Sequence, residues 1–145
     1  MTTYEIIDTI CDAVNPILAL ISIGFMIQFS IKKEFRKLAI SLVFFILCVV
    51  LVYGLMLLDN RLHIWPKFSS DYSTHTAVCL ALCIAIYVYS QRWIFVSIIF
   101  LLYCILMLIQ KYHTILDIVS TAFVVGFPLL LLARWLRKYF SCLHR

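Results

Sequence analysis

Long apolar stretches separated by short polar ones make up most of this chain. Five apolar runs lie along it, at residues 16–31, 38–58, 76–89, 93–109 and 115–132. A transmembrane helix needs about 20 consecutive apolar residues, within a range of about 17 to 25. The second run reaches this length easily, whereas the third is short. The pattern predicts an all-α fold, a single membrane-embedded domain over residues 1–145 that crosses the bilayer about five times.

The residues before the first run have an amphipathic pattern. Ile6, Ile7, Ile10 and Val14 share one face of a helix. Such a segment can lengthen the first transmembrane helix, or it can lie flat in the membrane interface as a sixth helix. The sequence leaves both arrangements open.

The composition also indicates a lipid environment. Hydrophobic residues make up 65% of the chain and charged residues 13%. A soluble domain is roughly half apolar and about a quarter charged. A chain of this size cannot hide the excess in a water-soluble core, because small domains keep a large surface. The membrane bilayer is therefore the expected surrounding of the protein.

The six cysteines predict neither a disulfide framework nor a metal or redox centre. Cys48, Cys79, Cys83 and Cys104 lie inside apolar runs, where cysteine behaves as a small hydrophobic residue. The chain has no C-x-x-C pair, which is the usual spacing of redox and zinc-binding cysteines. We expect no metal and no cofactor.

The net charge of +5 predicts a membrane topology and not a nucleic-acid partner, because the charges lie between the apolar runs. One predicted side of the membrane holds these basic residues: Lys32, Lys33, Arg36, Lys37, Arg92, Arg134, Arg137, Lys138 and Arg145. The other side holds Arg61, Lys67 and Lys111 together with the acidic residues Glu5, Asp8 and Asp12. Cytoplasmic loops carry the excess of Lys and Arg. The C-terminus is therefore expected in the cytosol and the N-terminus on the non-cytosolic side.

Four polar residues are predicted to meet at the non-cytosolic ends of the helices: Asp71, His75, His113 and Asp117. On a helix, residues four apart lie on one face, so Asp117 can orient the imidazole of His113 and make it more basic. Asp117 also falls within an apolar run, where an ionisable group is costly and indicates function by default. A structural role for Asp117, such as capping or pairing with Lys111 or a nearby threonine, is the competing interpretation.

The residues around His75 fit an anion site. Ser73 and Thr74 directly precede His75, where the third helix is expected to begin, and a helix N-terminus attracts anions. A histidine beside such a site can donate a proton to a leaving oxygen. Arg61, Lys67 and Lys111 are candidates to bind a phosphate, although each can also anchor a helix end at the membrane interface.

These two stretches resemble motifs of the type 2 phosphatidic acid phosphatase superfamily. Ser73-Thr74-His75 resembles the S-G-H of its P-S-G-H motif, and His113 to Asp117 matches its H-x3-D motif. The sphingomyelin synthase branch, with G-D-x-x-x-S-G-H-T and H-Y-T-x-D-V, is locally more similar to S-S-D-Y-S-T-H-T and Y-H-T-I-L-D-I here. The resemblance covers roughly residues 69–132, within a predicted catalytic core at about 59–132.

The resemblance implies a lipid phosphatase or phosphotransferase. His113 would be the nucleophile that forms a phosphohistidine, Asp117 would orient it, and His75 would protonate the leaving group. The acceptor is water in a phosphatase and an alcohol in a phosphotransferase. The substrate would be a phospholipid or lipid phosphate, with Asp71, Ser73, Thr74, Lys111, Arg61 and Lys67 as its binding residues.

Two other functions remain open at this stage. The chain has Thr74 where the family has glycine and Met107 where an arginine is usual. These departures favour a catalytically inactive relative that binds lipid or acts as a membrane assembly partner. The pairing of histidine and aspartate four residues apart also suits Zn²⁺ or proton transfer. No soft ligand joins the pair, which argues against a metal site.

Overall fold

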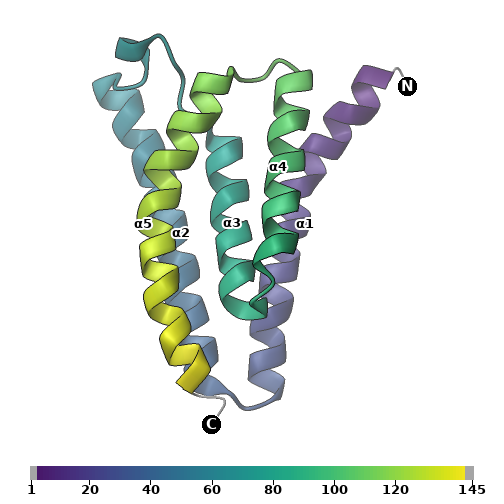
Figure 1. Cartoon of the computed structure of the whole chain (residues 1–145), viewed down its shortest axis with the longest axis vertical. Coiled ribbons are helices and arrows are strands. Elements are labelled where there is room, and N and C mark those ends of the chain that lie inside the picture. Colours follow the sequence, from purple (N-terminus) through teal and green to yellow (C-terminus); the bar gives the residue numbers. More distant parts are fainter. Residues whose placement is uncertain (1–2, 143–145) are drawn as a thin grey trace.

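The computed structural model describes residues 3–142, which form an all-helical bundle (Figure 1). Its elements are α1 (Thr3–Ile31), α2 (Phe35–Leu62), the short 3-10 helix η1 (Pro66–Phe68), α3 (Thr74–Ser90), α4 (Trp93–Ile109) and α5 (Ile115–Cys142). Three of these helices, α1, α2 and α5, are long and apolar enough to cross a membrane. The predicted fold class is confirmed.

The amphipathic N-terminal segment is part of α1 and not a separate sixth helix. The helix runs for 29 residues and continues through Pro16. At about 1.5 Å per residue it is about 44 Å long, which exceeds the roughly 30 Å hydrocarbon core. Of the two arrangements that the sequence left open, the structure has the longer first helix.

The shortest helices, α3 and α4, have 17 residues each, or about 26 Å. The turn that joins them stops short of the lower ends of α1, α2 and α5 (Figure 1). The third run was expected to be too short for a full crossing at ordinary membrane thickness. Its helix is three residues longer than the run, and it still ends inside the bundle's length.

Helix α3 is the central helix, and it packs against each of the other four. Ala77, Ala81 and Ala85 recur every fourth residue along it, and all three are buried. Small side chains allow neighbouring helix backbones to approach closely where lipid supplies no hydrophobic driving force between helices. Gly126 on α5 leaves room for a side chain of α3, since Leu80 Cδ2 lies 3.1 Å from where a Cβ would stand.

The helices alternate in direction, so polar segments gather at two opposite ends of the bundle (Figure 1). The histidine end contains the start of α1, the α2–α3 connection and the α4–α5 turn. The basic end contains these described residues: Lys32, Lys33, Arg36, Lys37, Arg92, Arg134, Arg137 and Lys138. Arg145, which belongs to the same predicted group, lies outside the described residues. The described basic residues that the sequence assigns to one side of the membrane therefore lie at one end of the folded bundle.

Large apolar side chains cover the outside of the bundle. Leu20 on α1, Val50 on α2 and Phe123 on α5 are 67%, 61% and 70% exposed. Soluble monomers rarely expose apolar patches of more than a few hundred Å². An apolar belt over the long helices is the surface that a bilayer requires.

Candidate functional site

Asp117 is the centre of the hydrogen-bond network at the histidine end. Its side chain lies in the first turn of α5 and is buried. Its Oδ1 accepts hydrogen bonds from Ser70 Oγ and from the backbone N–H of Asp71, both at 2.7 Å. These bonds join residues more than 45 positions apart in the chain. The carboxylate therefore holds the α2–α3 connection against the start of α5.

The other carboxylate oxygen of Asp117 caps its own helix. Oδ2 accepts from the backbone N–H of Thr114 at 2.7 Å, and Thr114 Oγ1 accepts from the N–H of Asp117 at 3.3 Å. This reciprocal pair is a capping box, which satisfies two N–H groups at the helix start. The structural interpretation of Asp117, including a nearby threonine as partner, thus has direct geometric support.

His113 lies in the turn before α5 and not on the helix, so the two side chains do not meet as helical neighbours. Its Nδ1 is 3.8 Å from Asp117 Oδ2. This distance suits an ion pair but is longer than a hydrogen bond. The spacing of four residues still brings the two groups together, because the turn directs the imidazole back toward the helix start.

The pKa of His113 is lowered from its ordinary value of 6.5. Partial burial is the largest cause, because removal from water disfavours the imidazolium. Asp117 and Asp71 raise the pKa, and the charge of His75 lowers it. The sequence predicted a more basic imidazole from the carboxylate alone, and burial reverses that direction. A neutral imidazole with a free lone pair is the favoured form near neutral pH.

His75 lies at the second position of α3, at the same end of the bundle as His113. Its ring is exposed and stacks on the ring of Tyr112, with centroids 6.4 Å apart and planes 8° apart. The backbone carbonyl of His75 accepts a hydrogen bond from Asn15 Nδ2 at 3.3 Å. Tyr112 therefore contacts the His75 ring, and the charge of His75 acts on His113.

Ser73 is committed to the helix start. It is fully buried and is the N-cap of α3, where its Oγ accepts from the N–H of Thr76. Its own N–H donates to Thr121 Oγ1 on α5 at 3.1 Å. One N–H of the helix start that was expected to attract an anion, that of Thr76, therefore already has a partner. Thr74 follows the cap and lines a cavity together with His75.

The candidate phosphate-binding cations are spread over the histidine end. The side chains of Arg61, Lys67 and Lys111 are exposed, and none of them forms an ion pair or hydrogen bond with a side chain that the structure describes. Met107, at the position where the family has arginine, is 1% exposed and belongs to the apolar core. These three exposed side chains are the cations nearest to the histidines in the sequence. No described contact fixes their positions.

Two neighbouring cavities lie beside the start of α3, and His75 lines one of them. The apolar one, of about 320 Å³, lies between α1, α2 and α3. The other, of about 250 Å³, is lined by Asp12, Thr74 and His75. Both are bordered by Asn15, Pro16, Tyr53 and Val78. The cavity between α1, α2 and α3 is apolar, whereas the cavity at His75 also has polar lining residues.

Sequence reasoning missed several residues of this site. Ser70 and Tyr112 carry no local signal, because their partners, Asp117 and His75, lie in distant segments of the chain. Thr114 could have been found, since T-x-x-D before an apolar run is the pattern of a capping box. The described residues contain no group of three or more His, Cys, Asp or Glu side chains placed to hold a metal ion.

No protein-family model, curated protein or solved structure matches this chain. The resemblance to the phosphatase superfamily rests on the motifs quoted above. Function is therefore argued from the geometry of the site.

Proposed function

We propose that the protein is a membrane-embedded lipid phosphatase or phosphotransferase that acts through a phosphohistidine. The observation that carries the proposal is the convergence of His75, His113 and Asp117 at one end of an apolar bundle. These groups come from two helix starts separated by about 40 residues. Following the distribution of Lys and Arg, this end lies on the non-cytosolic side and the helices cross the bilayer five times.

The proposed reaction begins with attack by His113. Asp117 faces Nδ1 of the imidazole, which leaves Nε2 to attack the phosphorus of a lipid phosphate. The bond between phosphorus and the leaving oxygen breaks, and His75 gives that oxygen its proton. Water or an alcohol, deprotonated by His75, then attacks the phosphohistidine and releases His113. The lowered pKa of His113 supports the first step, because only the neutral imidazole is a nucleophile.

The cavities beside His75 suggest how a lipid would bind. The apolar cavity between α1, α2 and α3 suits an acyl chain, and the polar cavity beside His75 suits the headgroup. Lys111, Arg61 and Lys67 would supply positive charge, with Ser73 and Thr74 shaping the start of α3. Asp71 would act by its charge on His113 and by its backbone bond to Asp117.

One observation favours a second function, that of a catalytically inactive relative that binds lipid or assists assembly. Asp117 already accepts three short hydrogen bonds from Ser70, Asp71 and Thr114. Those bonds give it a complete structural role, and the His113 contact at 3.8 Å adds little to them.

A phosphate-release assay on the full chain in detergent, with EDTA and a panel of lipid phosphates, separates these functions. We expect turnover by the wild type and its loss in His113→Ala. His63→Asn is the matched control, because His63 is an exposed histidine at the same end of the bundle. Its backbone is left-handed, a conformation that asparagine tolerates. An acid-labile, base-stable phosphorylated protein should be trapped when wild-type turnover is quenched, and it should be absent from His113→Ala.

Activity that survives in His113→Ala excludes His113 as the nucleophile. Absence of turnover on every lipid, with lipid binding retained, supports the inactive relative. Turnover that is abolished by EDTA but not by His113→Ala indicates a metal-dependent reaction and contradicts the phosphohistidine mechanism.

A further inference from the structure

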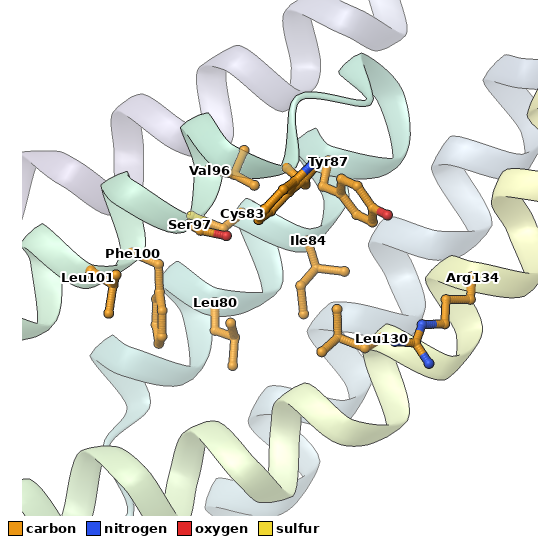
Figure 2. Close-up of a pocket in the computed structure, with 11 residues that line it drawn as sticks. Leu80, Cys83, Ile84, Tyr87, Val96, Ser97, Phe100, Leu101, Leu130 and Arg134 are labelled. Carbon is orange, nitrogen blue, oxygen red and sulfur yellow. The ribbon is translucent and has the colours of Figure 1, made fainter.

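A separate cavity lies between α3, α4 and α5 (Figure 2). No histidine lines it. Its volume is about 460 Å³. Leu80 and Ile84 on α3 form its floor, Phe100 on α4 forms one wall, and Leu130 and Arg134 on α5 form the other. The cavity exists because α4 and α5 both pack on α3 but do not pack closely on each other.

The groove is open toward the surrounding lipid. Leu101 and Trp93 on its α4 rim are 60% and 62% exposed, and Leu130 on its α5 wall is 43% exposed. Its lining is almost entirely apolar, with Arg134 as the one charged side chain. In a bilayer the groove is filled by lipid. An acyl chain matches its apolar lining and can enter through its open side.

Charge selects which lipid is bound. The side chain of Arg134 is exposed and has no ion pair or hydrogen bond to any side chain that the structure describes. The neighbouring Arg137 is already engaged, since its guanidinium lies 4.6 Å from the Tyr87 ring centroid and donates to the Tyr87 hydroxyl. Glu34 is the one described acidic residue at the basic end, and it pairs with Lys37 at 2.9 Å. The end of the groove therefore offers a positive charge and no competing carboxylate.

We infer that the α4–α5 groove binds an anionic phospholipid of the leaflet at the basic end, with an acyl chain along Leu80, Phe100 and Leu130 and the headgroup phosphate against Arg134. Basic pockets between transmembrane helices are recognised sites for anionic headgroups. The inference does not depend on the proposed function, because neither His75 nor His113 lines the groove.

Trp93 lines the groove and provides the probe. The chain has three tryptophans, so Trp65→Phe together with Trp135→Phe leaves Trp93 as the only one. The full-length protein is placed in phosphatidylcholine vesicles that contain increasing fractions of dibrominated phosphatidylglycerol or dibrominated phosphatidylcholine. Bromine quenches tryptophan fluorescence on contact. We expect half-maximal quenching at an about fivefold lower fraction of the anionic lipid, as one basic contact predicts.

Two controls separate a site from general enrichment of anionic lipid. A variant that keeps only Trp135, which is 55% exposed on α5, should be quenched to a similar extent by both lipids. Arg134→Gln should remove the selectivity at Trp93, whereas Lys32→Gln, an exposed charge at the same end, should leave it unchanged.

Three results would overturn the inference. Equal quenching of Trp93 by both lipids means that the groove holds any lipid. Selectivity at Trp135 equal to that at Trp93 means that the whole basic end attracts anionic lipid. Protection of Trp93 from both lipids means that another protein surface, such as a second copy of the chain, covers the groove.

Discussion

Replacement of Asp117 by alanine tests whether this carboxylate joins the two halves of the histidine end. The substitution leaves three donors without their acceptor: Ser70 Oγ–H and the backbone N–H groups of Asp71 and Thr114, each now at 2.7 Å from the carboxylate. Hydrogen bonds to a charged group contribute about 1.5–3 kcal/mol each. Full additivity would give about 4–9 kcal/mol.

The expected loss is smaller than that sum, because water can reach part of this site. Ser70 and Asp117 are buried, but Asp71 and Thr114 are exposed, so solvent can replace their lost bonds. We expect a decrease of about 2–4 kcal/mol in the free energy of unfolding, within the range for breaking a buried network. For a chain of this size, that corresponds to a fall of about 6–12 °C in melting temperature.

A thiol-reactive fluorescent dye provides the assay in detergent. Cys11, Cys48, Cys79 and Cys83 are free and buried, so dye labelling during heating reports unfolding. Asp71→Asn is the matched control, because the side chain of Asp71 is exposed and its contribution to the network is its backbone N–H. We expect that control to melt within about 2 °C of the wild type, as surface substitutions usually do.

Two results would refute this reasoning. If Asp117→Ala melts within about 2 °C of the wild type, the network does not hold the loop against α5. If Asp71→Asn and Asp117→Ala lower the melting temperature equally, the effect comes from the local charge and not from the hydrogen bonds.

Three further predictions concern the central helix and the histidine. Ser73→Ala removes the N-cap of α3 and should cost about 1 kcal/mol in the same melting assay, while Ser73→Asn should retain most of the stability. Ala81→Leu should cost about 1–3 kcal/mol because it overpacks the buried face of α3, whereas the exposed Leu101→Ala should change little. The pKa of His113 lies below 6.5, so any turnover should persist as the pH falls to 6.5 and decline only below it. Asp117→Asn removes a charge that raises this pKa, so it should move the acidic limb of the pH–rate profile to lower pH.

The boundaries of the inner helices could be predicted closely from the sequence, whereas α1 begins well before the first apolar run and α5 continues well past the fifth. The run 93–109 coincides with α4, because Arg92 and Gln110 are polar at its two ends. The starts of α3 and α5 were also close to their predicted positions. Helix formation is a local consequence of apolar length in lipid, where every backbone group must find its partner within the segment.

The packing order of the helices could not be predicted in this way. All five runs are apolar, and hydropathy alone does not distinguish a helix that faces lipid from one that faces protein. The small residues Ala77, Ala81 and Ala85 are consistent with the central position of α3. They do not identify α3 as the central helix until its neighbours are known.

The sequence by itself determined an all-α membrane bundle, its charge asymmetry and the pairing of His113 with Asp117, because these depend on run length, composition and short spacing. The tertiary structure decided that α3 is central, that Ser70 and Asp71 bind Asp117, and that burial lowers the pKa of His113. Those outcomes depend on contacts between segments distant in the chain and on the exclusion of water. Neither can be read from neighbouring residues alone.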